Sequence, residues 1–282
     1  MDISKHQLFL TVKDYSVSKE TFELYRDETL DLLITTPQPD KNTLPKYYES
    51  DDYISHTDGK RSLFEKAYHF IKNIALKNKL DLINGLNPGK GNLLDIGAGT
   101  GDFLIVAKNN GWNTKGVEPS EKAKSIAIQK GVSFAASTTD LESHSFDVIT
   151  MWHVLEHVPN LENQIRELKR LVKPNGTIII AVPNFNSYDA KHYGAFWAAY
   201  DVPRHLWHFS KTSIKILFEK EDLKLEKILP MKFDAFYVSL LSEKYKNGKM
   251  NFIKAFFVGL RSNIKAKSNF EFSSHIYVIK NN

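Results

Sequence analysis

The 282-residue chain contains no cysteine, which excludes disulfide bonds, thiolate metal sites and a cysteine nucleophile. It also lacks an apolar run of about eighteen residues, the length that a membrane-spanning helix needs. Its first residues, from Met1 to His6, have neither the basic start nor the apolar centre of a signal peptide. We therefore expect a cytoplasmic protein with a full apolar core, because 42% of its residues are hydrophobic.

Acidic residues are scarce in the last quarter of the chain. Residues 211–282 contain fourteen Lys or Arg and seven Asp or Glu, a surplus of seven positive charges. The whole chain carries +5, so residues 1–210 carry the balance of −2. Such a surplus can favour an acidic acceptor, a nucleic acid or an anionic membrane, although a lysine-rich solvated face is its usual meaning. We adopt the solvated face and expect no nucleic-acid partner.

Strand and helix patterns alternate through the chain after its first third. Strands are expected near residues 92–97, 114–118, 132–136, 146–151, 176–182, 224–230 and 274–279, and helices near 101–110, 120–130, 160–172 and 210–220. The continuous apolar run 177–182 is typical of a strand that is covered on both faces. The alternation predicts an α/β fold with a doubly wound, mostly parallel sheet.

Two regions lie outside this alternation. Residues 1–60 form an expected N-terminal extension ahead of a main domain at 61–282, and residues 234–270 form an expected insertion between the last two strands. The extension has short strand patterns at 8–12, 21–25 and 31–35. Apolar and basic residues are interspersed at helical spacing over 249–267, which suits packing onto the protein's own body, an oligomer contact or weak membrane-surface contact. We favour the first of these, and the sequence does not determine the oligomeric state.

The strongest local signal is a strand pattern that ends in Asp95 and Ile96 and is followed by Gly97, Gly99 and Gly101. Alternating glycines permit a sharp turn and let a ligand lie against bare peptide, and the helix that follows offers unpaired N–H groups. The next strand pattern ends in Glu118, whose carboxylate suits the two hydroxyls of a ribose. This combination predicts a nucleoside site.

The spacing of the glycines argues against a dinucleotide. The dinucleotide fingerprint places its third glycine one residue later, where a pyrophosphate comes close to the helix. Here Asp102 follows the third glycine, and its charge would oppose a phosphate. The carboxylate of Asp95 is instead suited to an amine.

The D-x-G-x-G-x-G pattern from Asp95 to Gly101, together with Glu118, resembles motif I and the ribose-binding acid of class I S-adenosylmethionine-dependent methyltransferases. Residues 146–158 resemble the F-D-x-I-x-x-x-x-x-L-E-H-V version found in small-molecule methyltransferases, the branch that includes ubiquinone- and menaquinone-pathway enzymes and tailoring enzymes. The likeness extends over 92–184. It implies a Rossmann-like sheet of seven strands, the last antiparallel, and S-adenosylmethionine as the cofactor. The cofactor-binding residues that it implies are Asp95, Gly97, Ala98, Gly99, Gly101, Glu118, Pro119, Met151 and Trp152. Related enzymes often carry a zinc ribbon ahead of this domain. Because this chain has no cysteine, residues 1–60 are at most a metal-free remnant of such a ribbon.

A dense group of aromatic and basic residues follows the fifth strand pattern. The segment 185–210 is expected to lie over the carboxyl edge of the sheet, where open α/β sheets bind ligands, and to receive the acceptor. We expect Arg204 to pair with an acidic group of the acceptor, Tyr200 to orient the acceptor, and either His157 or His205 to take its proton.

The residues from His153 to His157 match H-x-x-E-H, an inverted zinc-protease signature. That motif needs both histidines on one helix, but this segment follows a strand and meets Pro159 two residues later. We therefore expect no metal site.

Taken with the resemblance, these patterns predict an enzyme that transfers a methyl group from S-adenosylmethionine to oxygen or carbon of a small-molecule acceptor. Two alternatives remain at this stage: a methyltransferase-like module that binds without turnover, and an NAD-dependent oxidoreductase. The identity of the acceptor does not follow from the sequence.

Overall fold

The computed structural model describes residues 6–40, 42–48 and 63–281. The expected boundary between extension and main domain, at 60 and 61, lies outside the described residues. The main sheet has six strands in the order β5-β4-β6-β7-β10-β9. Their bounds are β4 Asn92–Ile96, β5 Asn113–Val117, β6 Phe146–Trp152, β7 Val172–Pro183, β9 Lys224–Pro230 and β10 Ser274–Lys280. Strands β5, β4, β6 and β7 are parallel, and β10 is antiparallel to both of its neighbours, β7 and β9. The predicted α/β fold with a mostly parallel sheet and an antiparallel last strand is confirmed.

Within the part of the chain that the structure describes, the sheet has one strand fewer than the seven expected. The strand predicted at 132–136 is reduced to an isolated parallel bridge between Gly116 and Phe134. The chain turns away directly afterwards, because the Ser137 side chain caps a short 3-10 helix, Thr138–Asp140, in a capping box. Local capping therefore ends the pairing before a ladder forms.

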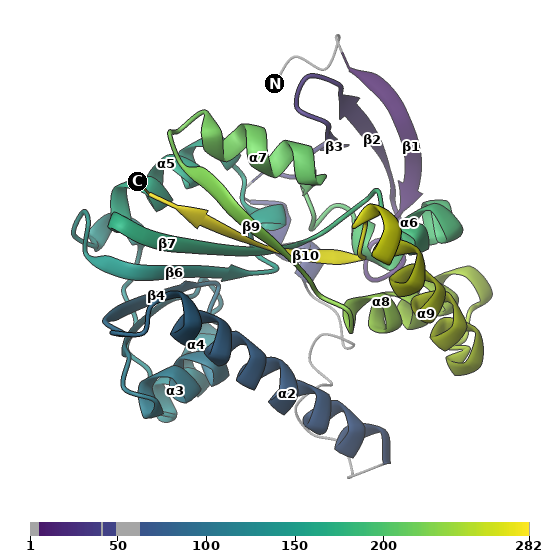
Figure 1. Ribbon diagram of the computed structural model, residues 1–282. Helices are drawn as coiled ribbons and strands as arrows, with labels where there is room; N and C mark the ends of the chain where they lie inside the picture. Colours follow the sequence, from purple (N-terminus) through teal and green to yellow (C-terminus); the bar gives the residue numbers. More distant parts are fainter. Residues whose placement is uncertain (1–5, 41, 49–62, 282) are drawn as a thin grey trace.

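Helices cover both faces of the main sheet (Figure 1). Helices α2 (Leu63–Leu86), α3 (Asp102–Asn109) and α4 (Glu121–Gln129) lie on one face, and α5 (Leu161–Leu171) and α7 (Lys211–Glu219) lie on the other. Along β7, Ile178 and Ile180 pack into the core beneath α5 and α7, whereas Ile179 packs with α2 and α3. The apolar run of this strand is thus explained by burial on both faces.

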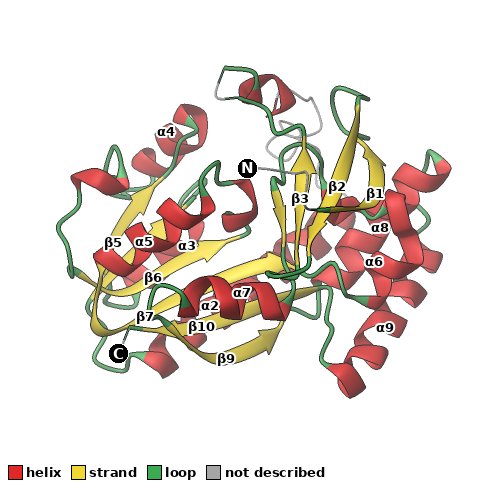
Figure 2. Ribbon diagram, turned by 90° about the horizontal axis from the view of Figure 1, so that it is seen from above, coloured by secondary structure: helices red, strands yellow, loops and turns green. Residues whose placement is uncertain are grey.

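A second, antiparallel sheet stands beside the first (Figure 2). It has the order β1-β2-β3-β8, with bounds β1 Gln7–Lys13, β2 Thr21–Asp27, β3 Leu32–Thr36 and β8 Trp207–His208. The first three strands match the strand patterns predicted in the extension. The fourth was not predicted: Trp207 and His208, from the expected acceptor segment, pair with Ile34 and Leu33. The N-terminal residues are therefore built into the expected acceptor side of the molecule.

The insertion forms two helices, α8 (Asp234–Asn247) and α9 (Phe252–Asn269), which pack together next to α6 (Tyr188–Tyr193) at the end of the molecule that carries β1 (Figures 1 and 2). The buried side of α9 consists of Ala255, Val258, Gly259, Ser262 and Ala266. A Cβ atom on Gly259 would lie 2.8 Å from the Phe236 ring, so the close approach of α8 and α9 requires a glycine there. Among the described residues, no helix is both long and apolar enough to cross a membrane.

Candidate active site

The loop after β4 contains three glycines with positive φ, at +72° for Gly97, +53° for Gly99 and +75° for Gly101. A Cβ atom on Gly97 would lie 2.3 Å from a methyl carbon of Val154, and one on Gly101 would lie 2.7 Å from a methyl carbon of Val132. A Cβ atom on Gly99 would meet no described atom within 4 Å. Packing therefore requires glycine at 97 and 101, whereas Gly99 faces open space at the carboxyl edge of the sheet.

The carboxylate of Glu118 is fixed to this loop. Its Oε2 accepts a hydrogen bond from the Gly99 N–H, and its Oε1 accepts one from the Ser120 N–H, each at 2.8 Å. Ala98 is held by a bond from its N–H to the carbonyl oxygen of Val117. Glu118 is partly buried and Pro119 is exposed. The acid and the glycine loop thus form one unit across the ends of two neighbouring strands.

Asp95 is buried beneath the loop and accepts a 2.6 Å hydrogen bond from the Thr150 hydroxyl. Burial raises its pKa to about 7, although Thr150 and the ammonium of Lys79 oppose this. Lys79 of α2 lies over the Trp152 ring, 4.3 Å from its centroid, and burial lowers its pKa. Lys79 could not be predicted from the sequence, since no spacing distinguishes it from the other lysines of this helix.

Met151 and Trp152, at the end of β6, point to opposite faces of the sheet. The Met151 side chain is fully buried in the core under α5 and α7. Trp152 is partly exposed and packs edge-on against Phe103, with centroids 5.7 Å apart. Of these two predicted residues, the structure brings only the Trp152 side chain to the face that carries Lys79.

A short 3-10 helix, Leu155–His157, follows β6 and brings two predicted residues together. One ligand atom each of Glu156, His157 and His205 lies within 4.8 Å of the others. The rings of His157 and His205 are 4.5 Å apart and nearly perpendicular. Burial and the neighbouring His205 lower the pKa of His157 to about 4. The Leu206 N–H bonds to the Glu156 carbonyl oxygen, which joins the two segments.

Arg204 and Tyr200 are buried nearby. The Arg204 guanidinium bonds to both carboxylate oxygens of Asp201, at 3.0 and 2.6 Å, to Asp14 at 3.2 Å and to the Tyr47 carbonyl at 2.9 Å. The partners of Arg204 are thus residues of the protein itself, whereas the predicted partner was an acidic group of the acceptor. Tyr200 lies between the rings of Trp197 and His208, and burial raises its pKa.

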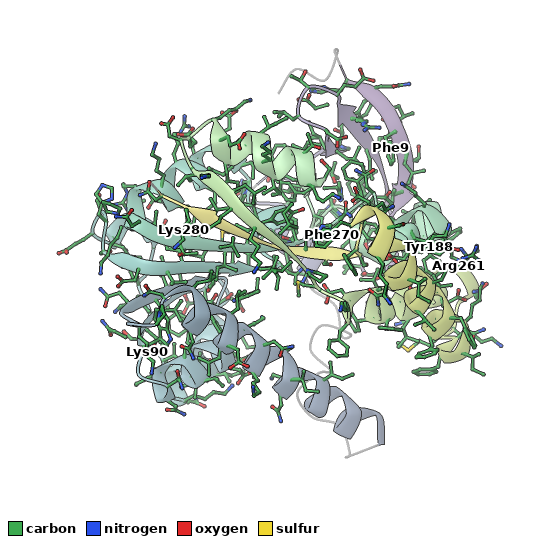
Figure 3. The ribbon with its side chains drawn as sticks, viewed as in Figure 1. Phe9, Lys90, Tyr188, Arg261, Phe270 and Lys280 are labelled. Carbon is green, nitrogen blue, oxygen red and sulfur yellow. The ribbon has the colours of Figure 1, made fainter. Side chains whose placement is uncertain are left out.

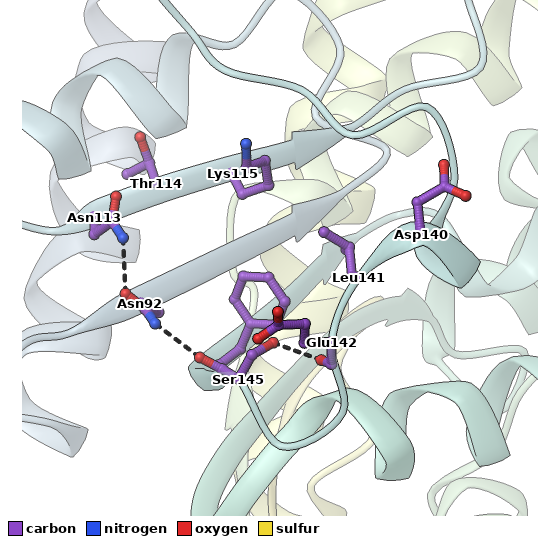
Figure 4. Close-up of a pocket in the computed structure, with 9 residues that line it drawn as sticks. Asn92, Asn113, Thr114, Lys115, Asp140, Leu141, Glu142 and Ser145 are labelled. Atoms are coloured by element: carbon purple, nitrogen blue, oxygen red, sulfur yellow. Dashed lines mark hydrogen bonds between the residues drawn. The ribbon is translucent and has the colours of Figure 1, made fainter.

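A cleft of about 260 Å³ lies at the opposite edge of the main sheet (Figure 4). The residues that line it are Asn92, Asn113, Thr114, Lys115, Asp140, Leu141, Glu142, Ser145 and Phe146. Asn92 and Asn113 begin β4 and β5, so this cleft is at the amino ends of the strands. Ligands of open α/β sheets bind at the carboxyl ends, and we therefore place the candidate site at the glycine loop.

The sheet order, the glycine loop and Glu118 define a Rossmann-like α/β domain. The sequence model of a family described as "Methyltransferase domain" matches residues 64–228, more than half of the chain. The protein therefore belongs to this family of methyltransferase domains.

The chain is similar to proteins named ubiquinone biosynthesis O-methyltransferase. It is 30% identical to the one from Azoarcus sp. over 146 residues, which are 47% of this chain and 63% of that protein. It is 30% identical to the one from Vibrio cholerae over 164 residues, which are 55% and 64% of the two chains. The matches thus span less than two thirds of these relatives.

Solved structures share the fold. A SAM-dependent methyltransferase from Thermotoga maritima, described as a possible histamine N-methyltransferase, has a TM-score of 0.53 and 20% identity over 77% of this chain and 94% of that one. The magnesium protoporphyrin IX methyltransferase of Synechocystis, solved with bound SAM, has a TM-score of 0.54 and 14% identity over 88% and 99%.

Proposed function

We propose that this protein transfers a methyl group from S-adenosylmethionine to an oxygen atom of a small-molecule acceptor. The observation that carries the proposal is the unit formed by Gly97, Gly99 and Glu118, at the carboxyl edge of a methyltransferase-family sheet. The choice of oxygen is supported by the names of the relatives. The acceptor itself stays unidentified.

The residues of the loop fit the parts of this cofactor. Glu118 would accept hydrogen bonds from the two ribose hydroxyls, beside Pro119, and the backbone from Gly97 to Gly101 would face the nucleoside. Asp95 and Lys79 are opposite charges at one end of the site, and they suit the amine and the carboxylate of a methionine group. Trp152, with Met151 behind it in the sheet, provides the wall between these charges and the acceptor side.

When bound, S-adenosylmethionine supplies a methyl group on a positively charged sulfur. The protein's own tasks are to align the acceptor, to exclude water and to provide for the acceptor's proton. We propose that His157 or His205, whose rings lie next to each other, takes the acceptor's proton. The buried Tyr200 ring forms an aromatic wall of the acceptor site. Since the Arg204 guanidinium is already paired, we assign it the positioning of this segment against the N-terminal sheet.

Replacement of Glu118 tests the cofactor site. We expect Glu118→Ala to weaken binding of S-adenosylhomocysteine, measured by calorimetry, at least tenfold. Hydrogen bonds to a charged group contribute about 1.5–3 kcal/mol each, and about 1.4 kcal/mol is a factor of ten. Glu121→Ala is the matched control, because this exposed glutamate lies one turn away and its ion-pair partner among the described residues is Lys124. Equal affinity in the Glu118 variant and the wild type would contradict the proposal that Glu118 binds the ribose.

We also propose weak contact with an anionic membrane surface through residues 249–267. Helix α9 exposes large apolar side chains, including Ile253 at 74% and Phe257 at 62%. The helix contains no acidic residue and has four basic ones, Lys254, Arg261, Lys265 and Lys267. Arg261 lies beside Tyr188 where α6 meets α9 (Figure 3). An apolar face rimmed by cations is complementary to anionic headgroups over an acyl layer.

Sedimentation with vesicles tests this contact. We expect the protein to bind phosphatidylglycerol vesicles and not phosphatidylcholine vesicles, and we expect Ile253→Glu combined with Phe257→Glu to reduce the bound fraction about fivefold or more. Ile128→Glu is the control, because Ile128 is 53% exposed on α4, away from this face. Equal sedimentation of all variants would contradict the proposal, as would a dimer in solution that the double variant dissociates.

A further inference from the structure

We propose that Glu156, His157 and His205 together bind one divalent transition-metal ion. One ligand atom from each residue lies within 4.8 Å of the other two, close enough for a single ion to contact all three after small adjustments. Two of the residues are consecutive in the 3-10 helix after β6, and the third comes from the segment before β8.

The two imidazoles are held in the tautomer that a metal requires. His157 Nδ1 lies 2.9 Å from the Arg204 carbonyl oxygen, and His205 Nδ1 lies 2.9 Å from the Ala199 carbonyl oxygen. A carbonyl oxygen can only accept, so both Nδ1 atoms carry the proton and each neutral ring presents a bare Nε2 lone pair. The Tyr48 hydroxyl, 3.2 Å from His157 Nδ1, does not change this assignment. Histidines that bind metals are commonly oriented through such a bond to a carbonyl.

The buried carboxylate of Glu156 has an ion-pair contact with His153 but, among the described residues, no hydrogen bond of good geometry. Its residue is 1% exposed, and within the described part of the chain neither oxygen has a hydrogen-bond partner. The His153 ring lies 3.4 Å from Oε1, and this ring also faces Asp234 at 3.2 Å. On the other side, His205 Nε2 lies 3.9 Å from Asp201, whose carboxylate is paired with Arg204. The three side chains thus offer electron pairs at close range, which a bound dication would compensate.

Two imidazoles and one carboxylate form a ligand set that suits zinc and other divalent transition metals. Three protein ligands leave a coordination position open, and His157 is only partly buried, so the ion can be reached from that side. What the ion would do rests on the proposed function. With the ion bound, the Nε2 atoms of both histidines would be occupied, so the ion would take over their role: it would lower the pKa of an acceptor hydroxyl, whose proton would pass to water.

Metal titration of the metal-free, full-length protein tests the site. We expect one zinc ion per chain by calorimetry and by elemental analysis after dialysis, and a visible absorption band with cobalt(II) from bound nitrogen ligands. Glu156→Gln and His205→Ala should each weaken zinc binding at least tenfold. His144→Ala is the matched control: its Nδ1 also faces a carbonyl oxygen, that of Val172 at 3.0 Å, but it lies at the opposite edge of the sheet.

Circular dichroism selects the variants that are folded, and His205→Gln replaces His205→Ala if the latter is not. Zinc uptake well below one ion per chain by folded wild type would overturn the inference, and the cluster would then share a proton instead. Unchanged zinc affinity in folded Glu156→Gln and His205 variants would also overturn it. Binding of S-adenosylhomocysteine, measured separately, reports on the proposed function whatever the metal result.

Discussion

Arg204→Ala is expected to lower the free energy of unfolding by about 3–5 kcal/mol, the usual cost of leaving a buried carboxylate, here Asp14, without its partner. The guanidinium is 7% exposed, and it joins Asp14 of the loop after β1 to Asp201 of the proposed acceptor segment. The measurement is urea denaturation at neutral pH. Lys77→Ala is the control, because its pair with Asp81 is exposed and its loss should cost less than about 1 kcal/mol.

The pH dependence gives a second readout of Arg204. Burial acts to raise the pKa values of Asp14 and Asp201, but backbone N–H groups at Asp14 and Arg204 at both residues hold them below the ordinary 3.8. Groups with lowered pKa values contribute stability above the unfolded value, and this stability is lost as the pH falls through the folded values. The wild type should therefore lose more stability below about pH 4 than Arg204→Ala does. A small stability change together with weakened acceptor binding would instead show that Arg204 binds the acceptor.

The second large effect is expected from a pair of glycine variants. Gly99→Val should weaken binding of S-adenosylhomocysteine at least tenfold, because the side chain would occupy the open space beside Glu118. Its cost in stability should be about 1–2 kcal/mol, from the positive φ alone. Gly97→Val carries the same strain and also places Cβ 2.3 Å from Val154, so it should cost a further 1–3 kcal/mol or so.

Calorimetry and denaturation of the two glycine variants separate ligand space from packing. Normal binding by Gly99→Val would show that the loop is a structural turn. Equal stability losses at both positions would show that backbone strain dominates and that the contact with Val154 relaxes.

The features that could be predicted from the sequence are those with local signals. The glycine loop, the strand before it and Glu118 are specified by turn chemistry and by apolar runs that stand close together in the chain. The caps of α4, α5 and α9 are local features as well, although they are not among the predictions above: Ser120, Asn160 and Asn251 each accept a bond from the N–H three residues later. One local signal was misleading. The pattern at 132–136 predicted a strand, but the cap at Ser137 ends the pairing after a single bridge between Gly116 and Phe134.

The tertiary structure alone decided which distant residues meet. H-x-x-E-H paired His153 with His157 in the sequence, whereas the fold turns His153 toward Asp234 and adds His205 to Glu156 and His157. Arg204 donates a hydrogen bond to Asp14, which lies 190 positions away in the sequence, and β8 pairs with the sheet formed by the N-terminal residues. Such contacts have no local period because they depend on how strands and loops pack in space. The sequence by itself determined the class of fold and the glycine loop with its acid, and packing decided which side chains meet on the proposed acceptor side.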